Sequence, residues 1–169
     1  TLQHVIAPFV EQYGPLPIFM AGQISSSIGW FETPYLTCPV TPEAITHSVC
    51  EHYSQAQLLY VMSGLRYQTA QGENDTMRGE ELQLLGLLQR YPHYQVGYHL
   101  VCLPGTHCKW VLLENGHVIK FKSAITGELF DVLLQHSMLL PKTTSVYTDD
   151  WPRFMEGCQY SLASSHEGL

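Results

Sequence analysis

The chain has 169 residues, about the length of one domain, and can bury a core without disulfides or metals. Hydrophobic residues make up 45% of it and charged residues 14%, which excludes a disordered segment. The net charge of −7 argues against a nucleic-acid partner, which needs a basic surface, but it leaves room for a small anionic ligand.

Helices and strands alternate in the first half of the sequence. In chain order we expect a helix over 1–13, a buried strand over 16–22, a loop over 23–35, a helix that begins at Thr41-Pro42, a strand over 56–64 and a polar loop over 66–76. Thr41 suits the N-cap and Pro42 the first helical position.

The second half adds a hairpin to this alternation. We expect a helix from Gly79 to Pro92, a strand over 94–105, two strands within 107–123 joined at Asn115-Gly116, a helix from Thr126 to Pro141 and a short helix after Asp149. The class predicted is α/β, with a mixed sheet flanked by helices in a single domain over 1–169.

Cysteine spacing and hydropathy limit the other classes. The number of cysteines is odd, at five, which favours free thiols in a reducing cytosol. His99, Cys102, His107 and Cys108 match no standard zinc spacing, so we expect no metal site there. No apolar run reaches the roughly 20 residues of a membrane helix, and we expect no membrane partner.

Three predicted strands end in glycine beside small or polar residues, at Gly22, Gly64 and Gly105. Ligands in open α/β sheets bind beyond the carboxyl ends of strands, and glycine lets a backbone approach a ligand closely. The alternative is that each glycine only makes a turn.

The segment Pro104-Gly105-Thr106-His107-Cys108-Lys109 is the strongest candidate for an anion site. A tight turn between antiparallel strands can direct several backbone N–H groups at one point, with a hydroxyl from Thr106 and a charge from Lys109. A plain β-turn with a surface lysine is an equally good interpretation.

A second candidate is Arg78-Gly79-Glu80-Glu81 at the start of a helix. Acidic residues in a first turn are favoured by the helix dipole alone. The functional alternative is that one glutamate is a general base and Arg78 grips an anionic group.

A third candidate, Thr126-Gly127-Glu128, also opens a helix. Its free N–H groups could bind an anion or a hydroxyl. Simple capping is the interpretation that we favour for this segment.

Four segments together resemble the 2-keto-3-deoxygalactonate kinase family of the sugar kinase/Hsp70/actin superfamily. They are MAGQISSSIGW (20–30), MRGEELQLLG (77–86), LPGTHCKWV (103–111) and ITGELFDVLLQHS (125–137). The resemblance implies an incomplete actin-like ATPase (ribonuclease H-like) domain. It also implies transfer of the γ-phosphate of ATP, with Mg²⁺, to the terminal hydroxyl of a 2-keto-3-deoxy sugar acid in the cytoplasm.

The resemblance also implies roles for individual residues. The phosphates of ATP would meet the turn at Gly105, Thr106, His107 and Lys109. Glu80 would be the catalytic base, with Glu81 in reserve. The sugar acid would lie near Gly22, Ser25, Trp30, Arg78, Thr126, Gly127 and Glu128, with Arg78 at its carboxylate.

The chain departs from the family pattern at both ends. The family begins with an Asp-Trp-Gly-Ser/Thr phosphate loop and ends with a Gly-rich adenosine segment, and neither is present in this sequence. We therefore expect a partial kinase domain that is weak or inactive alone, with an open sheet edge that favours a homodimer. The alternatives are a folded fragment that only binds a ligand or itself, and an exopolyphosphatase-like phosphohydrolase.

Overall fold

The structure is a computed structural model that describes residues 1–54, 57–138 and 150–164. The chain divides into two compact units, residues 1–133 and 134–169. Among the described residues, no helix is both long enough and apolar enough to cross a membrane.

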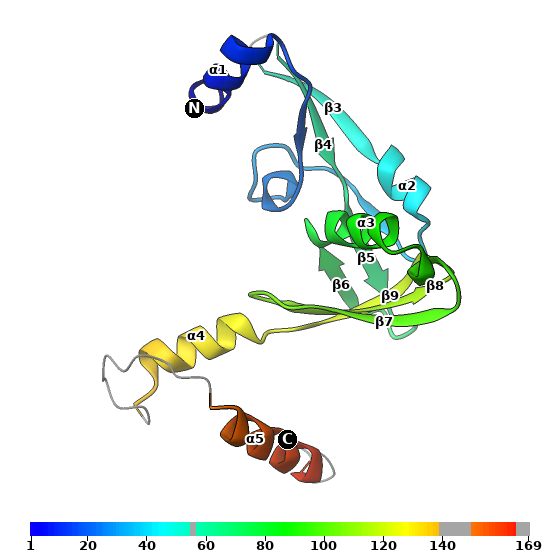
Figure 1. The fold of residues 1–169 in the computed structure, drawn as a ribbon, viewed down its shortest axis with the longest axis vertical. Coiled ribbons are helices and arrows are strands. Elements are labelled where there is room, and N and C mark those ends of the chain that lie inside the picture. The colour runs from blue at the N-terminus through cyan, green and yellow to red at the C-terminus, as the bar shows by residue number, and fades with distance from the viewer. Residues whose placement is uncertain (55–56, 139–149, 165–169) are drawn as a thin grey trace. The chain divides into compact units, whose positions relative to one another are not determined.

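Three sheets of three strands each form the framework of the first unit (Figure 1). The first has the order β1 (Ile18–Met20), β4 (Gln57–Met62), β3 (Val49–Ser54). The second has the order β2 (Tyr35–Thr37), β5 (Gly64–Gln68), β6 (Asn74–Met77). The third has the order β7 (Tyr98–Leu103), β8 (Cys108–Glu114), β9 (His117–Ala124).

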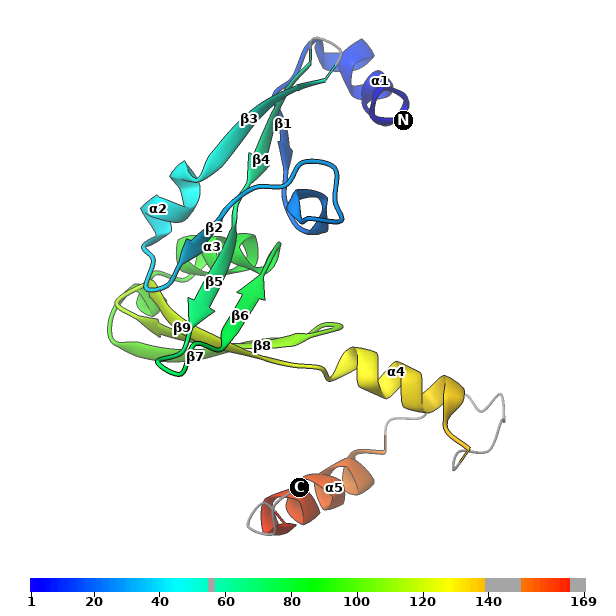
Figure 2. The same cartoon turned by 180° about the vertical axis from the view of Figure 1, so that it is seen from behind.

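The predicted class, α/β with mixed strand pairing, is confirmed. β1 pairs with β4 and β2 with β5 in parallel, whereas β3–β4 and β5–β6 are antiparallel. The third sheet is antiparallel throughout. β4 leads into β5 through the single residue Ser63, which links the first two sheets, as Figure 2 shows from behind.

The prediction of a polar loop over 66–76 is wrong, because the two ends of this segment lie in strands β5 and β6, which pair as a hairpin. The strand predicted over 56–64 corresponds to β4, which ends at Met62. Gly64 begins β5, and a Cβ on it would lie 2.5 Å from the Met77 carbonyl oxygen and from Arg78 Cγ. β2 and β3 were also not predicted, because their residues carry no apolar run and are fixed by partners elsewhere in the chain.

The helices of the first unit include α1 (Leu2–Tyr13), α2 (Pro42–His47), α3 (Glu80–Arg90) and the greater part of α4 (Gly127–His136). The Thr41 hydroxyl accepts a hydrogen bond from Ala44 N at 3.1 Å, which confirms the predicted N-cap. Asn115 and Gly116 both have positive φ, as a two-residue hairpin turn between β8 and β9 requires.

The core lies where α2 and α3 cover the second and third sheets. Ile45 of α2, Leu84 of α3, Leu65 of β5 and Val111 of β8 are all completely buried there. By contrast, α1 and α4 bury none of their described residues, although both show the predicted apolar spacing.

In the second unit, α5 (Trp151–Ser164) is the helix predicted after Asp149. The helix predicted from Thr126 to Pro141 appears as α4, which ends at His136. The last part of that prediction, residues 139–141, lies outside the described residues.

Candidate active site

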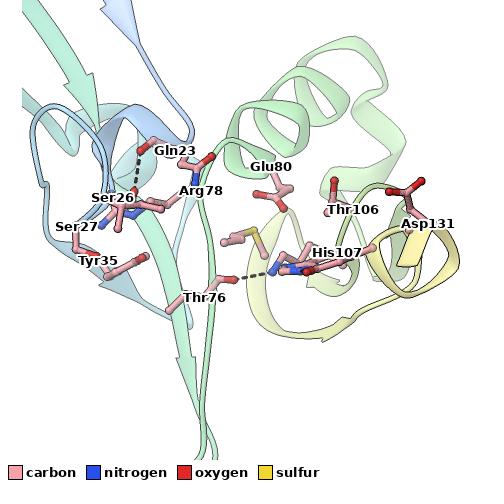
Figure 3. Close-up of a pocket in the computed structure, with 15 residues that line it drawn as sticks. Gln23, Ser26, Ser27, Tyr35, Thr76, Arg78, Glu80, Thr106, His107 and Asp131 are labelled. Carbon is pink, nitrogen blue, oxygen red and sulfur yellow. Dashed lines mark hydrogen bonds and ion pairs between the residues drawn. The ribbon is translucent and has the colours of Figure 1, made fainter. Parts of the chain in front are cut away.

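A cleft of about 930 Å³ lies in the first unit, where the second and third sheets, α3 and the start of α4 meet (Figure 3). Its lining comes from four segments that are distant in sequence, together with Tyr35: residues 23–28, 76–80, 106–109 and 127–131. In Figure 3, the Gln23–Ser27 segment with Arg78 lies on one side, and Glu80, Thr106, His107 and Asp131 lie on the other.

Two glycines let the chain fold tightly behind the cleft. Gly22 and Gly79 have φ values of 89° and 105°, a region that other residues rarely adopt. A Cβ on Gly79 would lie only 3.3 Å from the Cα of Gly22. This close approach sets the loop after β1 beside the start of α3.

Arg78 ties the loop after β1 to β6. Its Nη1 donates to the hydroxyls of Ser25 and Thr33, both at 2.8 Å, and its Nη2 donates to the Thr33 carbonyl at 2.6 Å. The guanidinium carbon lies 3.9 Å from the centre of the Tyr35 ring, a cation–π contact. Nε is buried and has no hydrogen-bond partner among the described residues, and the three contacts use three of the five guanidinium N–H donors.

The two glutamates at the start of α3 lie in different surroundings. Glu81 is 1% exposed, and both of its carboxylate oxygens accept from Gly79 N at 2.8 Å, which caps the helix. Burial raises the pKa of Glu81 above its usual value. Glu80 lines the cleft, and its Oε2 is buried without a hydrogen-bond partner among the described residues. A buried carboxylate oxygen without a partner can accept a hydrogen bond from a further group.

The turn between β7 and β8 is joined to the first residues of α4. Glu128 N donates to the Thr106 carbonyl at 3.0 Å, and His107 Nε2 lies 2.6 Å from Glu128 Oε2. A Cβ on Gly127 would lie 2.5 Å from the Gly105 carbonyl oxygen, so no larger residue fits without movement. The turn and the helix start therefore form one wall of the cleft.

Lys109 reaches the cleft wall but is only 5% exposed. Its Nζ donates to the Thr76 carbonyl at 2.7 Å and to the Ser123 hydroxyl, and it lies 4.0 Å from Asp75 Oδ1. Asp75 in turn accepts from the backbone N and the hydroxyl of Ser123, both at 2.6 Å. This network joins β6, β8 and β9 behind the cleft.

The structure brings many of the predicted residues together. The lining of the cleft includes Arg78, Glu80, Thr106, His107, Lys109, Gly127 and Glu128. Gly105 lines a smaller cavity of about 330 Å³ that also contacts Arg78, Glu80 and Thr106. Gly22, Ser25 and Glu81 do not line the cleft but contact residues that form it: Gly22 packs against Gly79, Ser25 accepts from Arg78, and Glu81 accepts from Gly79 N.

Two predicted residues are placed apart from the cleft lining. Trp30 stacks on Phe31 and lines a separate cavity with Thr1, Leu2, Gln3 and Ser54. Thr126 precedes α4, and its carbonyl accepts from Phe130 N at 2.9 Å, as an N-cap residue does. Thr126 thus lies directly before α4, at the N-cap position that the sequence predicts, and the choice between capping and ligand binding stays a prediction.

Several lining residues were missed by the sequence reasoning: Gln23, Ser26, Ser27, Ile28, Tyr35, Thr76, Met77 and Asp131. Asp131 follows Gly127 by four positions, and this helical spacing could have indicated it. Tyr35 and Thr76 lie in strands that were predicted as loop, so no local signal pointed to them.

Comparison with known proteins agrees with this architecture. A family model described as 2-keto-3-deoxy-galactonokinase matches residues 1–169. A protein of Rhizobium meliloti strain 1021, described as a probable 2-dehydro-3-deoxygalactonokinase, is 38% identical over 124 residues, which cover 73% of this chain and 39% of that protein. The 2-dehydro-3-deoxygalactonokinase of Escherichia coli K12 is 35% identical over 123 residues, with the same coverage.

A solved structure extends the similarity to the fold. The crystal structure of a Sinorhizobium meliloti protein, described under the name 2-dehydro-3-deoxygalactonokinase, superposes with a TM-score of 0.80 at 27% identity. The match covers 99% of this chain and 56% of that one. The fold of this chain is thus similar to that of a protein described as a 2-dehydro-3-deoxygalactonokinase.

The chain belongs to the 2-keto-3-deoxy-galactonokinase family. It spans 39% of the length of the two curated relatives that it matches.

Proposed function

We propose that the protein to which this chain belongs phosphorylates a 2-keto-3-deoxy sugar acid, 2-dehydro-3-deoxygalactonate, with ATP. The cleft carries this proposal because it sets a carboxylate, Glu80, beside a turn and a helix start that offer donors to phosphate. Family membership supplies the substrate class. A cytoplasmic location belongs to the same proposal and rests on the family resemblance.

The phosphate side of the cleft would be the wall formed by Thr106, His107 and the first turn of α4. Backbone N–H groups at a helix N-terminus favour anions, and the Thr106 hydroxyl and His107 ring add side-chain donors. Lys109 would act mainly through its positive charge, because its Nζ already donates to Thr76 and Ser123.

The acceptor side would be the wall that contains Gln23, Ser26 and Arg78. In this arrangement Glu80 takes the proton of the sugar hydroxyl as its oxygen attacks the γ-phosphorus and ADP leaves. Arg78 would hold the loop of Ser25 in place and offer the sugar acid only the donors that these contacts leave, since three of its five N–H groups are occupied.

The family resemblance implies Mg²⁺ in the reaction. Among residues 1–54, 57–138 and 150–164, no group of three or more His, Cys, Asp or Glu side chains could hold a metal ion. The described residues thus include no such cluster, and Mg²⁺ bound with ATP would rely chiefly on phosphate oxygens and water.

A coupled assay of ADP release tests the proposal on this chain, with Mg-ATP and 2-dehydro-3-deoxygalactonate. ADP release that requires the sugar acid supports the kinase. ADP release at the same rate without it supports phosphohydrolase chemistry instead. Nucleotide binding without any turnover supports a folded fragment that keeps only part of the site.

The Glu80→Gln variant tests the base in the same assay. We expect the rate to fall by roughly 10² or more, because the amide cannot take the proton. Glu73→Gln is the matched control, since Glu73 is exposed on the loop between β5 and β6 and does not line the cleft. Equal rates for the two variants would remove the base role from Glu80.

The proposal also includes a homodimer, which light scattering measures on the same sample. β3 is an edge strand of the first sheet, and an unpaired edge can pair with a second copy. A mass of one chain at every concentration tested would exclude this part.

A further inference from the structure

Two cysteine thiols bracket the turn that lines the cleft. Cys102 lies in β7 and Cys108 begins β8. Cys102 is opposite Trp110 in the antiparallel register, so Cys108 is its diagonal neighbour, two residues away on the same face. The two Sγ atoms are 3.4 Å apart.

The pair differs in access to solvent. Cys102 is exposed, whereas Cys108 is 6% exposed and pairs with Ala124 of β9 on its other side. A reagent in solution therefore reacts first with Cys102, and the buried Cys108 thiol is the second to react.

The separation of the thiols is close to what a disulfide needs. Bond formation brings the sulfurs from 3.4 Å to about 2.05 Å. Residues 104–107 belong to no helix or strand, and the last β7–β8 pair is Leu103 with Lys109. Cys102 and the turn can therefore move to close this distance, while the pairing with β9 keeps Cys108 in place.

We propose that Cys102 and Cys108 are an oxidative modification site that closes reversibly into a disulfide when hydrogen peroxide is the oxidant. The Cys102 thiolate attacks a peroxide oxygen, gives a sulfenic acid and releases hydroxide, which takes a proton to become water. The Cys108 sulfur then attacks the Cys102 sulfur, the S–O bond breaks, and the Cys108 proton leaves with hydroxide as a second water. The two thiols together lose two electrons and the peroxide gains them.

The chemistry of the two sulfurs suits this order. Burial and the contact with Cys102 raise the pKa of the Cys108 thiol, which keeps Cys108 protonated while Cys102 reacts. Cys38, in the core, also has a raised pKa, about 12, and the structure gives it no thiol partner among the described residues.

Closure would alter the cleft through the turn. The Thr106 carbonyl accepts from Glu128 N, and the Gly105 carbonyl lies directly against Gly127. A shift of Cys102 therefore moves Thr106 and His107 against the start of α4. This consequence rests on the proposed function, in which that wall holds phosphate.

Peptide mapping after peroxide tests the disulfide without any activity assay. Trypsin cuts after Arg90 and Lys109, so Cys102 and Cys108 share one peptide, Tyr91–Lys109, that holds no other cysteine. We expect this peptide to lose the mass of two hydrogen atoms and to resist alkylation. Dithiothreitol should restore both thiols.

The same digest contains its own controls. Cys38 and Cys50 share the peptide Thr1–Arg66, and Cys158 is alone in Phe154–Leu169. The Cys108→Ser variant should leave Cys102 as a sulfenic acid, whereas Cys50→Ser should still form the disulfide. The site is refuted if the 91–109 peptide keeps two free thiols under peroxide that oxidises Cys158, or if non-reducing gels show Cys102 linked between chains.

The link to the cleft has a separate readout, which is ATP binding before oxidation, after it, and after reduction. A reversible loss of affinity of about tenfold or more in the wild type, absent from Cys108→Ser, supports the link. Unchanged affinity in a fully oxidised sample overturns it. A reduced protein that binds no ATP counts against the proposed function, while the mapped disulfide still stands.

Discussion

Replacing Lys109 with methionine should show how much the buried network behind the cleft contributes to stability. The substitution keeps the apolar stem and removes the ammonium group. It leaves the Thr76 carbonyl without that donor and Asp75 without the nearby cation. Measured without nucleotide, the change in unfolding free energy reports the network and not phosphate binding.

The size of the effect follows from burial and from what Asp75 keeps. Breaking a fully buried charge pair costs about 3–5 kcal/mol. The Asp75 side chain is 26% exposed and retains both hydrogen bonds from Ser123, so the cost is reduced. We expect Lys109→Met to lower the free energy of unfolding by about 2–3 kcal/mol.

Urea unfolding followed by fluorescence measures this, with Lys122→Met as the matched control. Lys122 lies on β9 near Ser123 but is exposed, so its replacement should change stability by less than about 0.5 kcal/mol. The Lys109 and Asp75→Asn variants, combined in a double-mutant cycle, should show coupling. A loss below about 1 kcal/mol for Lys109→Met, or no coupling with Asp75, would refute the network.

Three further predictions concern the start of α3, the turn wall and the loop clamp. Burial raises the pKa of the Glu81 carboxyl above the value of 4.5 that it has in the unfolded chain. The stability that Glu81 contributes is therefore full below pH 4.5 and is lost as the pH rises through the raised folded pKa. Glu81→Gln should remove this loss from unfolding curves measured between about pH 4 and pH 7. Gly127→Ala should lower the free energy of unfolding by about 1–3 kcal/mol and weaken ATP binding, because its Cβ would clash with the Gly105 carbonyl oxygen. Gly86→Ala in α3 is the control: a Cβ there meets open space, and the change should stabilise the protein by about 0.5–1 kcal/mol. Arg78→Lys should loosen the loop after β1, since an ammonium cannot reproduce the forked contacts, and proteolysis of that loop should become faster.

Each of these has a contrary result. An unchanged pH profile in Glu81→Gln would mean that Glu81 carries no perturbed proton. Equal stability of Gly127→Ala and Gly86→Ala would mean that the turn does not press on α4. An unchanged rate of proteolysis of the loop in Arg78→Lys would show that the arginine contacts to Ser25 and Thr33 are dispensable.

Short sequence patterns predicted the helices and turns that depend mainly on neighbouring residues. The Thr41-Pro42 start of α2, the Asn115-Gly116 turn and the apolar spacing of α3 depend on neighbouring residues, and all appear in the structure. The turn at Gly105 was found for the same reason, since glycine and small polar residues between two apolar runs are typical of a hairpin. The proposed roles of these residues remain predictions.

The strands β2, β5 and β6 could not be read from local patterns. Arg66 and Asp75 lie in segments that are polar along the chain, and they become strands because distant segments pair with them. The same pairing decides the surroundings of Lys109, which looks like a surface residue in sequence but is buried against Asp75 and Ser123.

The sequence by itself determined the family, the class of fold and the segments that would line a cleft, because these follow from motifs and from short-range backbone preferences. Only the tertiary structure decided which side chains in those segments face the cleft. Glu80 and Glu81 are adjacent in the chain, yet one faces the cleft and the other caps α3 from within. That division follows from the packing of α3 on the sheets, which depends on contacts from the whole unit.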